Sequence, residues 1–254
     1  MYNNVPSIAT PISNMESWSG NQIDPVSNLQ NRKIYMEIGT ADPTVGLNPM
    51  NQLRDQLANF GDPAKTSFVT TQGAGHTFPT DFDAPGNSPC NVGSRSPYIS
   101  NCGYDGAGEV LKWMYGSLSP RNDGALTGSV VEYDQSGSFG AGGMGSKGYV
   151  YVPAACQSGS TTCKLHVALH GCQQSDTNIG RKFVDNTGYN KWAGMHFSQV
   201  LGRDVVFLTA LARHKQHHHF VSSDSAGLHP QDHLGRHHAA QPQRLLGLGW
   251  LVWI

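Results

Sequence analysis

Two residues in the first third of the chain have the types and the order that acid–base chemistry needs. Asp42 lies in GTADPTVG, just after the segment KIYMEIG, and His76 lies in the glycine-rich segment GAGHTF. A carboxylate can hold an imidazole in one tautomer, and the imidazole can then take a proton from a serine hydroxyl. Taken singly, an aspartate before proline is most often a turn residue, and a lone loop histidine is most often solvated. The order of the two residues and the neighbouring strands favour an acid–base pair.

A third segment could stabilise a developing negative charge. LHVALHG at 165–171 is apolar enough to be a central strand of a parallel sheet, and it leads into His170-Gly171-Cys172. Esterases place a backbone N–H in such a loop, where it donates to the oxyanion. Here the donor would be the N–H of Cys172. The alternative is a strand that ends at a glycine turn with a structural His170.

The nucleophile of such a site would be a serine in Gly-x-Ser-x-Gly, which precedes the acid and the histidine in many esterases. No pentapeptide of this form occurs in the 254 residues. The nearest sequence, GMGSKG at 143–148, has its serine in the wrong register and follows both Asp42 and His76. We therefore predict that this chain lacks the nucleophile and has no esterase activity by itself.

Four of the five cysteines fall into two closely spaced pairs. Cys90 with Cys102, and Cys156 with Cys163, each enclose a short loop rich in glycine and serine, which predicts two disulfides and an oxidising compartment. The alternative is two pairs of free buried thiols. Cys172 is then unpaired.

Strands and helices alternate around these residues, which predicts an α/β fold. The second of the two predicted helices turns Val110, Leu111 and Met114 inward. A glycine- and serine-rich connection around 134–148 precedes the last two predicted strands. In chain order these elements are strand 33–39, a helix from Asn48 to Phe60 with Met50, Leu53 and Leu57 on the same face, strand 67–71, helix 105–115, and strands 149–153 and 164–171.

The composition excludes several classes of partner. With 17 basic and 18 acidic residues, the chain has no charge excess for nucleic acid or an anionic membrane, so we expect an uncharged partner. No apolar stretch is long enough to span a bilayer. The histidine run at 217–219 suggests metal binding, but three consecutive histidines cannot all face one ion, so we predict no metal.

Several segments together resemble the single-domain extracellular polyhydroxybutyrate depolymerases of fungi. The resemblance covers residues 1 to about 193 and is carried by YNNVPSIATP, SWSGNQI, RKIYMEIGTADPTVG, TTQGAGHTFPTDF, SPYISNCGYDGAG, GYVYVPAAC and LHVALHGCQQS. It implies an α/β-hydrolase three-layer sandwich in circular permutation, here incomplete, with the oxyanion strand after the triad histidine. It also implies Asp42 as triad acid, His76 as general base and Cys172 as oxyanion donor.

The same resemblance implies a secreted monomer that acts on an insoluble polyester or its oligomers, without a metal or an organic cofactor. In that family a signal peptide and a G-L-S-S-G-type elbow precede the segment that matches MYNNVPS. We therefore expect Met1 to be an internal methionine and the serine to lie in sequence that this reading frame does not reach.

The last quarter of the chain departs from the family. Beyond about Gly194 the apolar periodicity fades, and nine of the twelve histidines follow. Read one base out of frame, residues 241–254 become compatible with N-P-N-G-C-W-D-W-V-G-W-Y-G, which resembles the family's C-terminal region. A retained intron between Gly194 and Arg213 would produce this shift, and it would remove the family's cysteine partner of Cys172. We therefore expect residues 1–193 to form a partial catalytic domain and residues 194–254 to be an aberrant, disordered tail.

Three alternatives remain at this point. A feruloyl or acetyl-xylan esterase is the first, because loops like LHGCQQS also occur there. A catalytically silent polymer-binding protein is favoured by the missing serine and disfavoured by the retained Asp42, His76 and oxyanion segment. Lastly, the chain as written need not fold stably.

Overall fold

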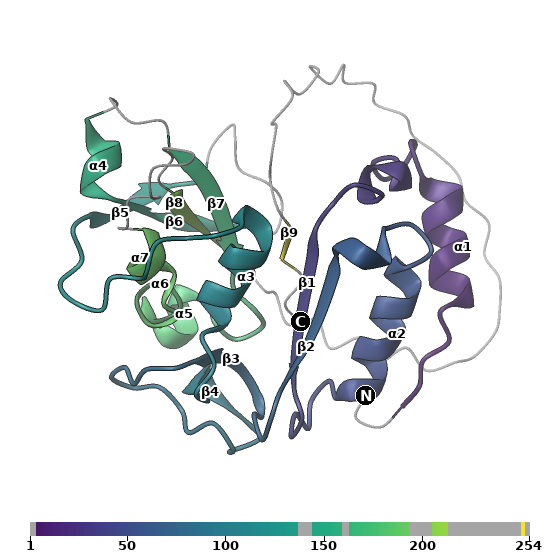
Figure 1. Cartoon of the computed structure of the whole chain (residues 1–254), viewed down its shortest axis with the longest axis horizontal. Coiled ribbons are helices and arrows are strands. Elements are labelled where there is room, and N and C mark those ends of the chain that lie inside the picture. The colour runs from purple at the N-terminus through teal and green to yellow at the C-terminus, as the bar shows by residue number, and fades with distance from the viewer. Residues whose placement is uncertain (1–3, 137–143, 159–162, 194–204, 213–249, 252–254) are drawn as a thin grey trace.

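The computed structural model of the chain describes residues 4–136, 144–158, 163–193, 205–212 and 250–251. It contains both strands and helices, which agrees with the predicted α/β class (Figure 1). The strands are β1 (Ile34–Gly39), β2 (Thr66–Thr71), β3 (His76–Thr80), β4 (Ser94–Asn101), β5 (Ser129–Asp134), β6 (Met144–Val152), β7 (Lys164–Leu169), β8 (Val205–Ala212) and β9 (Trp250–Leu251). The helices are α1 (Ala9–Trp18), α2 (Leu47–Leu57), α3 (Gly106–Tyr115), α4 (Ala154–Gln157), α5 (Asp176–Ile179), α6 (Lys182–Asn186) and α7 (Tyr189–Ala193), with 3₁₀ turns η1 (Val26–Leu29) and η2 (Pro63–Lys65).

The strand–helix–strand unit β1–α2–β2 carries the turn that holds Asp42. β1 and β2 pair in parallel from Ile34 opposite Thr66 to Gly39 opposite Thr71. Apolar side chains of the helix and the strands form one buried cluster between them. The sequence predicts a helix that extends to Phe60, but α2 ends at Leu57, so Phe60 lies beyond it. The cluster comprises Ile34, Met36, Ile38, Val45 and Met50, with Leu53, Leu57 and Phe68 packed against it.

Two further sheets lie beside this unit. β3 and β4 form a parallel pair, and a four-stranded sheet has the order β5-β6-β8-β7. Figure 1 shows the four-stranded sheet with α3 and α5 to α7 on one side of the molecule, and β1, β2 and α2 on the other. A second buried cluster joins these parts, because it draws on β1, β3, β4, β6, β7 and the helices between them. Its largest members include Tyr35, Phe78, Ile99, Leu111, Tyr151, Phe183, Tyr189 and Trp192.

The structure corrects three sequence predictions about local elements. His76 is the first residue of strand β3, not a loop residue. The connection predicted around 134–148 is shorter, because β5 continues to Asp134 and β6 begins at Met144. Among the described strands, β7 lies at the edge of its sheet, although the sequence predicts a central strand: it pairs in parallel with β8, and it leaves Leu165 and Leu169 exposed.

Two segments of the tail are described, and both are strands. β8 lies between β6 and β7, and β9 pairs in parallel with β1. The prediction of a disordered tail otherwise falls outside the described residues, as does the histidine run at 217–219. Among the described helices, none has both the length and the apolar character that crossing a bilayer requires.

Candidate active site

Asp42 and His76 meet at the ends of neighbouring strands. Nδ1 of His76 lies 2.8 Å from Oδ2 of Asp42, although the two residues are 34 positions apart. The turn after β1 and the turn after β2 are held together by backbone bonds: Thr40 N–H donates to Thr71 O at 3.0 Å, and Ala41 N–H donates to Ala74 O at 2.9 Å. Because β1 and β2 are parallel, the segments that follow them lie at the same edge of the sheet, and these segments carry Asp42 and His76.

The second carboxylate oxygen of Asp42 is held by its own turn. Oδ1 accepts the N–H of Thr44 at 2.7 Å and the N–H of Val45 at 3.0 Å. Burial raises the pKa of Asp42, but the hydrogen bonds from His76 and from these two amides outweigh it, so the net pKa is lowered. Asp42 is therefore both a turn residue and the ionised partner of an imidazole, and the two interpretations of the sequence do not compete.

The imidazole of His76 lies at a small pocket. Its side chain is 17% exposed, whereas that of Asp42 is 2% exposed. Because Nδ1 faces the carboxylate, Nε2 is the ring nitrogen that would exchange a proton with a reacting hydroxyl. Together with Asp42 and His76, the pocket is lined by Glu37, Ile38, Gly39, Gly75 and Thr77.

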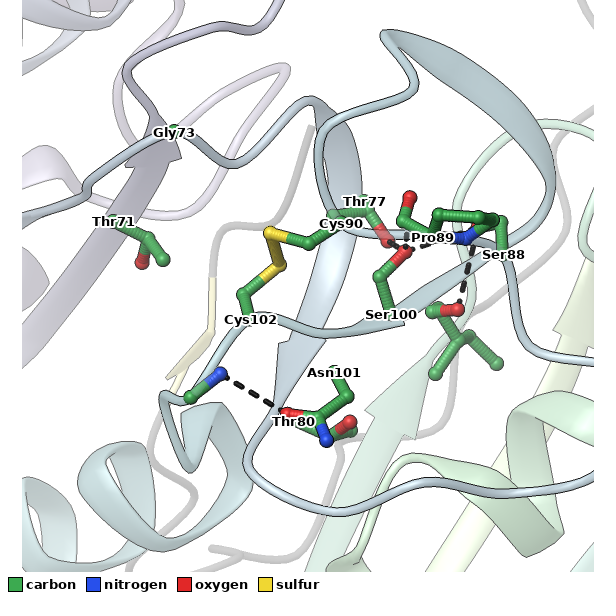
Figure 2. The surroundings of a disulfide bond; sticks show 12 residues. Thr71, Gly73, Thr77, Thr80, Ser88, Pro89, Cys90, Ser100, Asn101 and Cys102 are labelled. Atoms are coloured by element: carbon green, nitrogen blue, oxygen red, sulfur yellow. Dashed lines mark hydrogen bonds between the residues drawn. A yellow bond between two sulfur atoms is a disulfide. The ribbon is translucent and has the colours of Figure 1, made fainter.

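A disulfide-closed loop supports the backbone of His76. The Gly75 N–H donates to Cys90 O at 2.9 Å, and the His76 N–H donates to Gly93 O at 2.5 Å. Cys90 and Cys102 are joined by a disulfide that closes this loop. Figure 2 shows the disulfide beside the strand that carries Thr77.

Buried hydroxyl groups join the same loop to β3. Thr77 Oγ1 lies 2.7 Å from Ser100 Oγ, and Ser88 Oγ lies 3.0 Å from Ser100 Oγ (Figure 2). Ser100 is fully buried, so its hydrogen-bonding capacity must be met inside the protein. The hydroxyl cluster and the disulfide therefore fix the loop to the strand that begins with His76.

The remaining cysteines lie elsewhere. Cys156 and Cys163 form the second disulfide, between α4 and β7. Cys172 is a free, exposed cysteine in the loop after β7. The described residues contain no group of three histidine, cysteine, aspartate or glutamate side chains placed to hold a metal ion.

The loop after β7, residues 170–174, is the candidate oxyanion loop. It is closed on itself by the Gln174 N–H, which donates to Gly171 O at 3.3 Å. Within the described part of the chain, the Cys172 N–H has no backbone or side-chain acceptor, which leaves it able to donate to a ligand. Tyr98, which the sequence did not indicate as a site residue, connects this loop to His76: its hydroxyl donates to Gln173 Oε1, and its ring meets that of His76 edge-on, with centroids 6.2 Å apart.

Glu37 is a second carboxyl group at the pocket, and it was not among the predicted site residues. Burial raises its pKa, the hydrogen bond from Thr71 Oγ1 lowers it and the charge of Asp42 raises it again, so that the pKa is raised to about 7. Its signal in the sequence is a single acidic residue inside the otherwise apolar segment IYMEIG.

The serine of GMGSKG does not complete this site. Ser146 lies on β6 in the four-stranded sheet, whereas Asp42 follows β1 and His76 begins β3. The structure thus brings Asp42, His76 and the loop of Cys172 together through Tyr98, and it leaves Ser146 in a different sheet.

An aspartate after one parallel strand, a histidine after the next and a glycine-containing loop after a third define the class of the protein. This arrangement, with helices packed against the strands, is that of the α/β-hydrolases. No protein-family model matches the chain. It is 63% identical over 193 residues to the polyhydroxybutyrate depolymerase of Talaromyces funiculosus, and 43% identical over 188 residues to the poly(3-hydroxybutyrate) depolymerase of Delftia acidovorans. The chain is therefore similar to polyhydroxybutyrate depolymerases over about three quarters of its length.

The match spans only part of these proteins. It covers 76% of this chain and 57% of the Talaromyces protein, and 73% of this chain and 37% of the Delftia protein. The crystal structure of PHB depolymerase from Penicillium funiculosum is similar with a TM-score of 0.77 and 58% identity, over 84% of this chain and 64% of that one. A variant of a PHB depolymerase with one serine replaced by alanine, complexed with an R3HB trimer, matches with the same values.

Proposed function

We propose that the chain provides the acid–base pair and the oxyanion loop of a serine esterase that hydrolyses polyhydroxybutyrate or related short-chain polyhydroxyalkanoates. The observation that carries this proposal is the 2.8 Å contact between His76 Nδ1 and Asp42 Oδ2 at a pocket. The 63% identity to a polyhydroxybutyrate depolymerase supports the substrate class.

The proposed reaction needs a serine that the 254 residues do not contain in the form Gly-x-Ser-x-Gly. The serine oxygen attacks the ester carbonyl while its proton passes to His76 Nε2, and Asp42 stabilises the imidazolium that results. The Cys172 N–H donates to the oxyanion. The imidazolium returns the proton to the departing alcohol, and water then repeats the sequence on the acyl-enzyme to release the acid.

We further propose that the enzyme is secreted. Two disulfides suit secretion into an oxidising medium, where an insoluble polymer is accessible. We propose that the enzyme acts as a monomer on the polyester or its oligomers, since one chain supplies both partners of the acid–base pair.

The test supplies the missing nucleophile. We define the extended form as this chain joined at its N-terminus to an upstream segment with a Gly-x-Ser-x-Gly elbow, which is what the family resemblance implies for the preceding sequence. The extended form should clear polyhydroxybutyrate granules and hydrolyse a soluble butyrate ester, and His76→Ala should abolish both activities. Asp55→Asn, on the exposed face of α2, is the matched control and should change neither. Hydrolysis by the 254-residue chain alone, lost on His76→Ala, would show that the nucleophile lies within it.

Substrate panels separate the rivals. A feruloyl or acetyl-xylan esterase would prefer feruloylated or acetylated sugars over the polyester. A silent polymer-binding protein is favoured by the absence of Gly-x-Ser-x-Gly from the sequence. Granule binding without turnover in the extended form would support that alternative against the proposed esterase.

A further inference from the structure

Gln174 is a fully buried polar residue whose side chain joins two distant parts of the chain. Its Oε1 accepts the Gly171 N–H at 2.9 Å. Its Nε2 donates to Pro97 O at 2.9 Å and to Tyr98 O at 3.2 Å, across 77 and 76 residues. Both N–H donors of the amide are thereby used. Because the acceptor faces Gly171 and the donors face β4, the amide has only one orientation that satisfies these contacts.

The two segments joined by Gln174 hold unusual backbone conformations. Tyr98 has a φ of 59° and Gln173 a φ of 61°, and among the described residues these are the only non-glycine residues with positive φ. Such conformations are unfavourable for residues with a side chain and persist where the surroundings fix them, which happens most often at functional sites. The two residues also contact each other, because the Tyr98 hydroxyl donates to Gln173 Oε1.

The contacts of Gln174 lead directly to the acid–base pair. Tyr98, whose carbonyl accepts from Gln174, places its ring edge-on to the His76 ring at an interplanar angle of 73°. On the other side, Gly171 and Gln174 bracket Cys172, whose N–H has no acceptor among the described residues. A continuous set of contacts therefore runs from the oxyanion loop through Gln174 and Tyr98 to His76.

We propose that Gln174 is a positioning residue that anchors the oxyanion loop to β4 beside His76. It fixes the distance and the orientation between the Cys172 N–H and the imidazole, which must act on the same ester group. This inference rests on the proposed function for its catalytic consequence, whereas the anchoring itself is a property of the folded chain.

The anchoring is tested first on the 254-residue chain. Gln174→Met keeps most of the side-chain volume but removes every hydrogen bond of the amide. By NMR, the Gly171 amide should exchange with deuterium at least about tenfold faster in this variant, because the Gln174 side chain is the acceptor that Gly171 N–H has among the described residues. Gln157→Met is the matched control: Gln157, the last residue of α4, also donates to a backbone carbonyl, that of Val152, but does so at the surface. It should leave Gly171 unchanged.

A second variant separates the two halves of the anchor. Gln174→Glu retains an acceptor for the Gly171 N–H and loses the donor to Pro97 and Tyr98. Gly171 should stay protected, while the Tyr98 ring signals shift. Unchanged exchange at Gly171 in Gln174→Met, or faster exchange by the same factor at every amide, would overturn the anchoring.

The catalytic consequence is measured on the extended form. Gln174→Met should lower kcat for a butyrate ester about 10- to 100-fold with little change in KM, somewhat less than the loss of about 10²–10³ on removal of an oxyanion donor. If Gly171 exchanges faster in Gln174→Met but kcat is unchanged, Gln174 does not position the oxyanion loop for catalysis. If the extended form hydrolyses no ester, the proposed function fails, while the exchange measurement still decides whether Gln174 anchors the loop.

Discussion

Asp42 holds His76 with one carboxylate oxygen while its own turn holds the other. Oδ2 lies 2.8 Å from His76 Nδ1, and Oδ1 accepts the N–H of Thr44 and the N–H of Val45. The carboxylate therefore has little freedom to rotate. An imidazole held in this way presents Nε2 in a single tautomer, which is the state that a general base requires.

Replacing Asp42 by asparagine tests this relationship. The amide can donate to His76 Nδ1, which favours the wrong tautomer, and in the extended form kcat should fall about 10⁴-fold. The measurement is the initial rate with a soluble butyrate ester, compared with Asp55→Asn as the exposed control. A fall of less than about tenfold with the fold intact would contradict the role assigned to Asp42.

Glu37 should make the stability of the protein depend on pH. Its pKa in the fold is raised to about 7, above the ordinary 4.5, so the fold favours the protonated form. The stabilisation is complete below about pH 4.5 and is lost as the pH rises through 7. Because Glu37 is only half-buried by surface area, we expect a change on the order of 1–3 kcal/mol across this window.

Glu37→Gln should remove this pH dependence. Urea unfolding at pH 5 and pH 8 should give a smaller difference between the two pH values for the variant than for the unchanged chain. Glu109→Gln, on the exposed ion pair with Lys112, is the control. Asp42 does not interfere, because its lowered pKa places its own loss of stabilisation below this window. Equal pH dependence of Glu37→Gln and the unchanged chain would refute the assignment.

The two disulfides should differ in their effect on His76, although both close short loops. Chain-entropy arguments give about 3 kcal/mol for the Cys90–Cys102 loop and about 2.5 kcal/mol for the Cys156–Cys163 loop. Replacing either pair by serines should therefore lower stability by similar amounts. Only the first pair closes a loop whose carbonyls accept from Gly75 and His76.

The readout for the disulfides is the imidazole of His76. Its NMR signals should shift and broaden when Cys90 and Cys102 are both serine. They should stay unchanged when Cys156 and Cys163 are replaced, even though unfolding occurs at lower urea in both variants. Identical His76 spectra in the two variants would show that the Cys90–Cys102 loop stabilises the fold without supporting the acid–base pair.

The contact between Asp42 and His76 agrees with what the sequence predicts, whereas their catalytic roles remain a proposal. Asp42 follows an apolar strand and His76 stands alone in a glycine-rich segment, so the order of the two residues, the neighbouring strands and the family resemblance favoured a pair. β3 and β4 were not predicted, since HTFPT and SRSPYISN contain proline and lack regular alternation. β7 was predicted to be central because its apolar composition does not reveal how many strands pair with it.

The contacts of Gln174 had no such local signal. Its partners lie 76 and 77 residues away, and a glutamine after a strand and a glycine is most simply a loop residue. Glu37 could have been selected, since an acidic residue inside an apolar strand needs a reason. The raised pKa that makes it unusual depends on burial against the Asp42 turn, which only the fold provides.

Gly75 gives the most direct test of how closely the His76 backbone is packed. A Cβ at this position would lie 2.1 Å from Gly93 O, the atom that accepts the His76 N–H at 2.5 Å. Gly75→Ala must therefore displace that carbonyl and lengthen its hydrogen bond. We expect a loss of about 1–3 kcal/mol in unfolding free energy.

The same variant should change His76 itself. In Gly75→Ala, the His76 amide should exchange faster with deuterium and the extended form should lose activity beyond what its stability explains. Gly61→Ala is the matched control, because a Cβ there meets no atom closer than 3.4 Å. If both variants lose equal stability and neither moves the His76 signals, the packing against Gly93 does not position the imidazole. If only Gly75→Ala shifts the His76 signals, the packing of the disulfide-closed loop positions the imidazole of the acid–base pair.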